Sequence, residues 1–397
     1  MKILLLNLYF PPDTSATAKM AATVVDALSA QHDVTVLCGR PSYDPSERRA
    51  WRLWQTESRG RARVIRVGST DYPRFAMKRR VLNYFSYVAL SIPGALFLRC
   101  DAVLAMTDPP FEGIVGAVVA LFKRKPYVYN IRDMYPDMAV GGAIFEPGPL
   151  ARVWEKLHRW ALRRATRVIV LGEDMRARIT VKGIDPAKIE IARDGAEIFP
   201  PPLLDNEVIR TIRGGFPFVL LHAGNLGFYG AWETLIKAAT NLEADGVGLV
   251  FVGEGAQREH VEKLAKNAKN VRFLPFFPSS KIASVLAAAD AHVITVKRGL
   301  EGVVVPSKMY GILAAGKAIV AIAPEETDAA TLGAKFGFAV SADPDNPEGV
   351  TAAIRSLVKD GAKVQSMGRA ALAVAPDYDR VKELQKFMKI IEGAVNA

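Results

Sequence analysis

The stretch FVLLHAGNLGFYGAWETLIKAATNL, residues 218–242, decides the fold class of this chain. Its beginning, Phe218–Ala223, is an apolar run of strand length, and its end, Ala231–Leu242, has the apolar spacing of an amphipathic helix. The segment between them is rich in glycine, which permits tight turns. A fully apolar strand that turns directly into a helix is the repeating unit of parallel sheets covered by helices on both faces.

The same alternation of apolar runs and helical stretches continues almost throughout the chain in both directions. Amphipathic spacing predicts helices between the runs, for example over Ala18–Leu28 and Ser307–Ala314. We therefore predict an α/β protein with two doubly wound, Rossmann-like domains. The predicted strands are Lys2–Leu6, Val34–Leu37, Arg63–Val67, Ala102–Met106, Tyr127–Ile131, Arg167–Leu171, Ile189–Ala192, Phe218–Ala223, Gly248–Val252, Val271–Leu274, Ala291–Thr295, Ala318–Ile322 and Phe338–Val340.

A stiff proline segment, Phe199-Pro200-Pro201-Pro202, interrupts this series, which then restarts. We place a domain boundary there, so that the first domain covers residues 1–199 and the second covers residues 200–377. The final helix, within residues 378–397, is expected to pack back onto the first domain. Two such domains leave a cleft at the carboxyl ends of both sheets, which is where ligands bind in doubly wound folds.

Composition limits the class of protein and of partner. Half of the 397 residues are hydrophobic and 23% are charged, which excludes a disordered or fibrous protein. Cys38 and Cys100 are too few for a disulfide framework or a structural zinc site, and the N-terminus lacks the pattern of a signal peptide, so we expect a cytoplasmic protein. The net charge of +11 predicts an anionic partner: nucleic acid, an acidic lipid surface or a phosphorylated substrate.

Much of the positive charge lies in the first half of the chain, within Arg40–Arg99 and Arg152–Arg167. The first region includes the uncharged apolar segment Val81–Leu98, in which Pro93 is expected to break a helix. Each basic region alone could be a solvated helix face. Together with the apolar segment they favour an acidic membrane surface, and no nucleic acid, as the partner. We expect the segment to lie on the inner face of the cell membrane, as part of a peripheral protein, rather than to cross it.

The loop after the first predicted strand, NLYFPPDTSATA at residues 7–18, contains no glycine. Dinucleotide-binding domains need GxGxxG at this place so that the backbone can approach a pyrophosphate, and the missing glycines argue strongly against an NAD or FAD dehydrogenase. Thr14 or Ser15 could act only as the N-cap of the following helix. In the functional interpretation, the loop forms the floor of the cleft.

Polar residues also follow the predicted strand Tyr127–Ile131. Arg132 and Asp133 could form no more than a local salt bridge, and Asp137 lies shortly after them. However, the carboxyl end of a strand faces ligand in this fold, and a carboxylate there can orient or deprotonate a hydroxyl group. We therefore favour a functional role for these residues.

Two patterns in the second half indicate phosphate binding. The GxxGxxG loop Gly224–Gly230 would expose backbone N–H groups at a helix N-terminus, and Gly253-Glu254-Gly255 follows the next strand. Ser307 begins a helix with Lys308 in its first turn, where a cation opposes the helix dipole. A bound diphosphate would compensate this charge, whereas the alternative is a lysine that faces solvent.

These stretches together resemble the family 4 glycosyltransferases of the two-domain GT-B fold, especially bacterial surface-polysaccharide enzymes that include fucosamine transferases. The resemblance covers nearly the whole chain. It is carried by KILLLNLYFPPD (2–13), KRRVLNYFSY (78–87), TDPPFEG (107–113), YNIRDMYPD (129–137), LLHAGNLGFYGAWETLIKAA (220–239), LVFVGEGAQRE (249–259), NVRFLPFFP (270–278) and VVVPSKMYGILAAGKAIVAI (303–322).

The resemblance implies transfer of a sugar, with retention at the anomeric carbon, from a nucleotide-diphosphate donor to a lipid-linked or polysaccharide acceptor in cell-surface glycan synthesis. The expected donor carries UDP and an N-acetylated aminosugar, and neither a metal nor another cofactor is expected. In the second domain it implies a donor site made of Gly224, Asn225, Gly227, Glu254, Gly255, Arg298, Ser307, Lys308 and Gly311. It further implies acceptor binding by Ser15, Arg132 and Asp137, and catalytic roles for Asp13, Asp133 and Lys308.

The chain departs from the family pattern at two places. Many members carry a pair of glutamates at the positions of Val303 and Gly311. In many relatives an arginine and a lysine bind the diphosphate, and their positions fall near Asn225 and Tyr229 of this chain. The phosphate charge would then be neutralised by Lys308, by Arg298 or Lys297, and by backbone N–H groups. Two other functions stay open, a nucleotide-sugar 2-epimerase of the same fold and a catalytically weakened protein that binds nucleotide or lipid.

Overall fold

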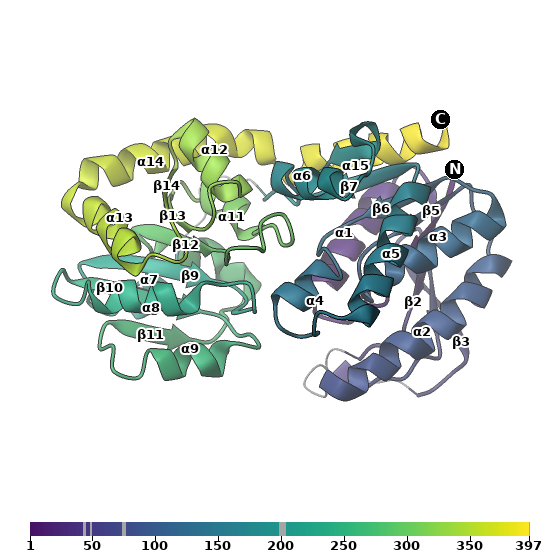
Figure 1. Ribbon diagram of the computed structural model, residues 1–397, viewed down its shortest axis with the longest axis horizontal. Helices are drawn as coiled ribbons and strands as arrows, with labels where there is room; N and C mark the ends of the chain where they lie inside the picture. Colours follow the sequence, from purple (N-terminus) through teal and green to yellow (C-terminus); the bar gives the residue numbers. More distant parts are fainter. Residues whose placement is uncertain (43–44, 48–49, 74–76, 198–203, 397) are drawn as a thin grey trace.

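The computed structural model describes residues 1–42, 45–47, 50–73, 77–197 and 204–396. Two domains lie side by side, each built on one sheet with helices packed around it, and the C-terminal helix lies over the first domain (Figure 1). The strand that begins the second sheet and the helix that follows it come from the glycine-rich stretch 218–242.

The first domain has a sheet with the order β3-β4-β2-β1-β5-β6-β7-β8. Its ladders are parallel except that between β3 and β4. Sequence patterns missed β3, because this edge strand alternates exposed and half-buried residues instead of forming an apolar run. The elements are β1 (Lys2–Leu6), α1 (Ala16–Ser29), β2 (Asp33–Cys38), β3 (Trp54–Arg59), β4 (Ala62–Val67), α2 (Met77–Phe97), β5 (Ala102–Ala105), α3 (Glu112–Lys123), β6 (Tyr127–Asn130), α4 (Asp137–Gly141), α5 (Pro149–Arg164), β7 (Arg167–Val170), α6 (Glu173–Val181) and β8 (Ile189–Ile191).

The second domain has an all-parallel sheet with the order β11-β10-β9-β12-β13-β14. Both strand orders confirm the predicted fold class, two doubly wound α/β domains. The elements are α7 (Asn206–Arg213), β9 (Phe218–Ala223), α8 (Trp232–Thr240), β10 (Val247–Val252), α9 (Arg258–Leu264), β11 (Val271–Leu274), α10 (Ile282–Ala287), β12 (Ala291–Thr295), α11 (Lys308–Ala314), β13 (Ala318–Ile322), α12 (Asp328–Phe336), β14 (Ala339–Ala342), α13 (Pro347–Lys359) and α14 (Gly361–Val374). The last helix, α15 (Arg380–Val395), follows this domain and packs on the first one.

Each sheet reverses its strand order at its first strand. In the first domain β1 lies between β2 and β5, and in the second domain β9 lies between β10 and β12. The loops after neighbouring strands run in opposite directions at such a point and leave a crevice at the carboxyl ends. This topology directs attention to the loops after β1, β5 and β6 and after β9, β10 and β12.

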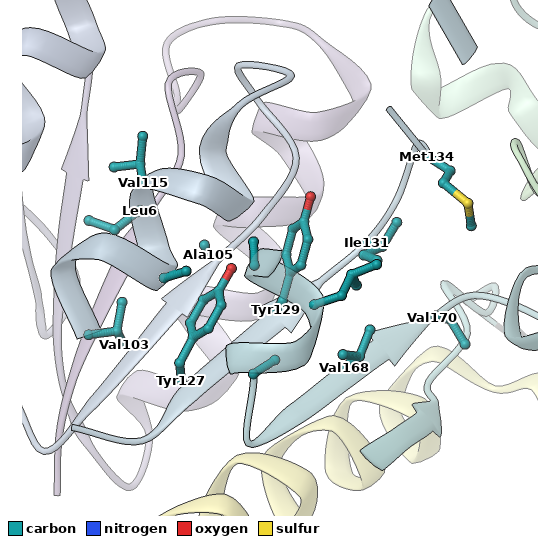
Figure 2. Packing of buried hydrophobic residues seen from close by; sticks show 14 of the residues in the cluster. Leu6, Val103, Ala105, Val115, Tyr127, Tyr129, Ile131, Met134, Val168 and Val170 are labelled. Atoms are coloured by element: carbon teal, nitrogen blue, oxygen red, sulfur yellow. The ribbon is translucent and has the colours of Figure 1, made fainter. Parts of the chain in front are cut away.

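The largest apolar cluster extends from the first domain into the second. Figure 2 shows Tyr127 and Tyr129 of β6 among the side chains of neighbouring strands, and their rings stack with centroids 6.0 Å apart. The same cluster includes Leu300 and Val303 from the segment between β12 and α11. A continuous core therefore connects the two domains along this segment.

A second connection joins the N-termini of one helix from each domain. The Asp328 carboxylate of α12 accepts hydrogen bonds from the backbone N–H groups of Glu173 (2.9 Å) and Asp174 (3.4 Å) at the start of α6. In return, the Asp174 carboxylate accepts one from the N–H of Asp328 at 3.2 Å. Arg193 pairs with Asp328 at 3.1 Å, so this buried carboxylate is neutralised. Each helix thus supplies the cap of the other.

The chain returns to the first domain at its end. Helix α15 contacts α1, β6 and β7, and its residues Phe387, Ile391 and Ala394 are buried in a cluster with the apolar side chains of β1 and β2. The predicted domain boundary at Phe199–Pro202 lies outside the described residues. On its near side, Ala196 forms a parallel bridge with Asp379, just before α15.

Helix α2 corrects one expectation. It runs unbroken from Met77 to Phe97 through Pro93, whereas the sequence suggested a break. Pro93 lies on the exposed side of the helix, where a freed carbonyl group can be hydrated. Exposed apolar side chains, Leu82, Phe85 and Phe97 among them, share this outer surface. Among the residues that the structure describes, no helix has the length and apolar character needed to span a membrane.

Candidate active site

A cavity of about 300 Å³ opens beside the carboxyl end of β9. Ala223 and Gly224 of the β9 loop and Val252 of β10 form one wall, and Ser307, Lys308 and Gly311 form another. Four of the residues expected to bind the donor, Gly224, Ser307, Lys308 and Gly311, are therefore brought together. The remaining lining residues are Gly195, Ala196, Phe276, Phe277, Pro278, Ser279, Ile282, Val285, Leu286 and Arg380.

Lys308 reaches across this cavity from the first position of α11. Its Nζ lies 3.1 Å from Nε2 and 3.3 Å from Nδ1 of His222, and 3.7 Å from where a Cβ on Gly224 would stand. No carboxylate of the described residues forms an ion pair with it, and burial lowers the pKa of Lys308 to about 7. Burial and the Lys308 charge hold the pKa of His222 well below its usual value, so His222 supplies no compensating charge. An anion in the cavity would restore the ammonium form.

The glycines around the cavity keep two loops close together. Gly253 has φ +150°, and a Cβ there would lie 2.0 Å from the carbonyl oxygen of Gly224. A Cβ on Gly255 would lie 2.3 Å from the carbonyl oxygen of Leu226, whose N–H donates to the Glu254 carbonyl at 2.9 Å. Only residues without a side chain permit this approach. Gly253 and Gly255 therefore shape the β9 loop, and Gly255 does not line the cavity.

Other residues expected at the donor site do not line this cavity. Asn225 accepts a hydrogen bond from Tyr229 Oη through its carbonyl oxygen, at 2.9 Å, and Gly227 packs beneath the Tyr229 ring. Glu254 forms an ion pair with Arg258 at 2.7 Å. Arg298 is exposed and pairs with Asp343 and Asp345, each at 2.7 Å, on the border of a different cavity.

Sequence reasoning missed the apolar side of the cavity. Phe276, Phe277 and Pro278 come directly after β11, and Ile282 and Leu286 lie on α10. The stretch PFFP (residues 275–278) could have indicated this apolar wall, because aromatic residues at the carboxyl end of a strand are placed where ligands bind in this fold. Arg380, at the start of α15, was missed because only the return of the chain brings it to this cavity.

Asp133 lies where the domains meet. It forms an antiparallel bridge with Val304, and the N–H of Met134 donates to the Val303 carbonyl at 3.0 Å. Burial, reinforced by Asp108, raises the pKa of Asp133 to about 6. Burial and the Asp133 charge together raise the pKa of Tyr229, from the second domain, to about 12. The segment 303–308 therefore connects a carboxylate of the first domain with the lysine of the cavity.

The other residues expected on the acceptor side have internal partners. Arg132 forms an ion pair with Asp194, and both side chains are largely buried. Asp137 binds Lys182 (2.7 Å) and Arg178 (3.1 Å), and against the effect of burial these two cations lower its pKa.

Two residues of the β1 loop have positions that stabilise the loop itself. Ser15 is the N-cap of α1, where its hydroxyl accepts a hydrogen bond from the Ala18 N–H at 3.1 Å. The Asp13 carboxylate is buried and accepts a hydrogen bond from the N–H of Ser42 at 2.9 Å. Both groups thus stabilise the loop at the carboxyl end of β1. Among the described residues, no three His, Cys, Asp or Glu side chains are grouped as metal ligands would be.

Two family patterns match the chain, one in each domain. The pattern described as "Glycosyl transferase 4-like domain" matches residues 15–195, and that described as "Glycosyl transferases group 1" matches residues 212–374. WcaI of Escherichia coli (strain K12), named as a colanic acid biosynthesis glycosyl transferase, is 25% identical over 377 residues, which are 90% of this chain and 92% of WcaI. WbjE of Pseudomonas aeruginosa, named as a glycosyltransferase, is 25% identical over 73% of this chain and 74% of its own.

Solved glycosyltransferase-like structures share the fold of this chain. The crystal structure of HepE from Anabaena in complex with UDP-glucose matches with a TM-score of 0.69 and 18% identity over 99% of this chain and 100% of HepE. The two matched patterns cover the two sheets described above, and the structural match extends across both domains. The chain is a glycosyltransferase of the family 4 type, with the GT-B fold.

Proposed function

We propose that this enzyme transfers an N-acetylated aminosugar from a UDP-sugar to a lipid-linked or polysaccharide acceptor in cell-surface glycan synthesis, with retention of anomeric configuration. One observation carries the proposal. Lys308 is a partly buried amine without a carboxylate partner among the described residues, and it faces a cavity whose opposite wall is the glycine-rich loop after β9. Such an amine is suited to bind a diphosphate, because the phosphate groups supply the negative charge that no carboxylate of the described residues provides.

The proposed chemistry follows from the positions of Lys308 and Asp133. As the bond between sugar and diphosphate breaks, negative charge grows on the leaving phosphate, and a protonated Lys308 stabilises it. Asp133, mostly ionised at neutral pH, accepts a hydrogen bond from the acceptor hydroxyl and orients it. The hydroxyl attacks from the face that the diphosphate leaves, and its proton passes to the leaving phosphate oxygen. Configuration is retained because attack and departure share one face.

The apolar wall suits the nucleoside. Phe276, Phe277 and Pro278 would contact the base, with Gly311 leaving room beside Leu286 for the ribose. The UDP-glucose complex of HepE supports a uridine nucleotide, and the name of WcaI supports an acceptor in polysaccharide synthesis.

The same proposal places the enzyme on the inner face of the cell membrane as a peripheral protein. Helix α5 exposes Leu150, Val153 and Leu157, and Arg152 and Lys156 are exposed on the same helix. Together with the outer surface of α2, this combination of apolar and basic side chains is suited to an acidic lipid surface.

Calorimetric titration with UDP, GDP, CDP and dTDP tests the donor site. We expect saturable binding of UDP, weakened about tenfold or more in Lys308→Ala, because a charge-assisted contact is worth about 1.5–3 kcal/mol. Lys335→Ala, which removes an exposed lysine of the same domain, is the matched control. Absence of UDP binding would contradict the donor assignment. UDP binding without transfer, tested with UDP-N-acetylglucosamine and cell-membrane lipid extract, would instead indicate a weakened binding protein.

A further inference from the structure

Arg80 occupies an unusual position near the start of α2. It is partly buried, its Nη2 donates to Tyr9 Oη at 3.0 Å, and its guanidinium lies 6.0 Å from the Tyr9 ring centroid and 5.7 Å from that of Tyr84. Its buried Nε has no hydrogen-bond partner among the residues that the structure describes. Tyrosine rings orient a guanidinium, but they leave most of its five N–H donors available.

Arg80 also lacks the carboxylate that comparable arginines have. Within the described residues no Asp or Glu lies at ion-pair distance from it, although Asp108 attracts it from farther away. Three other largely buried arginines of this domain are paired. These pairs are Arg40 with Asp71, Arg66 with Glu57, and Arg132 with Asp194. A partly buried cation without a counter-ion is costly unless an anion joins it.

The surroundings of Arg80 belong to the acceptor side of the cleft. Tyr9 follows β1, Asp108 follows β5, and Tyr135 follows β6, at the carboxyl edge of the sheet. Arg80, Asp108 and Asp133 all act on the titration of Tyr135, so these groups share one neighbourhood. An anion held by Arg80 would therefore lie near the carboxylate that we propose orients the acceptor hydroxyl.

An apolar surface continues from Arg80 along the same helix. Val81, Leu82 and Phe85 are exposed within the next five residues. The Phe85 ring stacks on Phe111 with centroids 6.0 Å apart, and Phe111 lies 5.0 Å from Trp154 of α5. A hydrocarbon chain attached to an anion at Arg80 would find an apolar path between α2 and α5.

We propose that Arg80, with the hydroxyls of Tyr9 and Tyr84, binds the phosphate of a lipid-diphosphate acceptor, and that its hydrocarbon chain lies along the exposed surface of α2. This inference rests on the proposed function, because it assigns the acceptor of that site. The phosphate replaces the distant attraction of Asp108 with direct, charge-assisted hydrogen bonds. Binding there delivers the acceptor sugar to the Asp133 side of the cleft.

The test measures binding of farnesyl diphosphate by calorimetry to protein saturated with UDP, so that the Lys308 cavity is filled. We expect saturable binding that weakens about 10- to 100-fold in Arg80→Gln and partly recovers in Arg80→Lys, which keeps the charge but loses the planar fork. Arg79→Gln is the matched control, because Arg79 is exposed and adjacent. Farnesol should bind equally weakly to all variants, and an unchanged melting temperature checks the fold.

Equal affinity of wild type and Arg80→Gln for farnesyl diphosphate, or an equal loss in Arg79→Gln, would overturn the inference. Sedimentation with phosphatidylglycerol vesicles distinguishes the source of the phosphate. If Arg80→Gln weakens vesicle binding but not farnesyl diphosphate binding, the site takes a phospholipid headgroup and the acceptor assignment is wrong. Failure of UDP to bind wild-type protein would contradict the proposed function alone, since farnesyl diphosphate can then be titrated into Lys308→Ala, which removes the other candidate phosphate site, with and without Arg80→Gln.

Discussion

Donor binding should depend on pH through Lys308, whose charge the fold suppresses. In the free protein the pKa of this amine is lowered to about 7 by burial, and no anion compensates it within the described residues. A bound diphosphate favours the ammonium form and raises the pKa in the complex. Binding of UDP therefore takes up a proton at Lys308, and affinity falls as the pH rises above about 7.

The size of the effect follows from the pKa. At pH 7 about half of the free protein carries the charge, and at pH 9 about one molecule in a hundred does. If the complex keeps Lys308 protonated throughout, the dissociation constant of UDP rises roughly 50-fold between pH 7 and pH 9, which is about 2.3 kcal/mol. The terminal phosphate of UDP, with a pKa of about 6, is already ionised over this range and adds little.

Calorimetry from pH 6 to pH 9.5, in buffers of different ionisation enthalpy, measures both the affinity and the proton uptake. Neighbouring histidines do not interfere, since burial lowers the pKa of His292 to about 4 and that of His222 well below its usual value. Lys308→Met should bind UDP weakly and without this pH dependence. A constant affinity between pH 7 and pH 9 in wild type, or the same slope in Lys308→Met, would refute the reasoning.

Three further outcomes are expected. Gly253→Ala should lower the free energy of unfolding by about 2–3 kcal/mol in urea titrations and weaken UDP binding, because its Cβ meets the Gly224 carbonyl at φ +150°. Arg132→Ala should destabilise the protein by about 3 kcal/mol in the same assay, since it leaves buried Asp194 unpaired. Phe97→Glu, at the most exposed apolar residue of α2, should reduce sedimentation with phosphatidylglycerol vesicles about tenfold or more without changing UDP affinity.

Matched substitutions separate these effects from general damage. Gly361→Ala places a Cβ where nothing lies within 4 Å and should leave stability unchanged or slightly raised. Val181→Glu alters an equally exposed apolar side chain on α6, and vesicle binding should survive it. Loss of vesicle binding in both variants would argue that charge alone governs membrane contact. A smaller effect of Arg132→Ala than of Gly361→Ala would contradict the role of the ion pair.

Sequence patterns predicted the parallel sheets because fully buried strands have no polar face to obscure them. They also predicted that Lys308 would need an anion, from its place in the first turn of a helix. They could not assign partners to Arg298 or Asp137, since Asp343 and Lys182 come from distant elements. An ion pair and a ligand site look alike until the fold shows which charges meet.

The continuity of α2 and the apolar wall of the cavity were missed for different reasons. Pro93 suggests a break from local sequence alone, but its exposure on the surface of the domain decides whether the helix tolerates it. Phe276 and Phe277 gave an ambiguous signal, because aromatic residues after a strand serve core packing as often as ligand contact. Arg380 reaches the cavity only through the return of the chain, which no local pattern encodes.

The exchanged caps of α6 and α12 limit how the two domains can move. Pulling the domains straight apart would strip the N–H groups of Glu173, Asp174 and Asp328 of their acceptors and would leave Arg193 without its counter-ion. Turning one domain about this point keeps all of these contacts while the far edges separate. The pair therefore favours rotation of the domains about it over their separation, and such a rotation would also have to break the bridge between Asp133 and Val304.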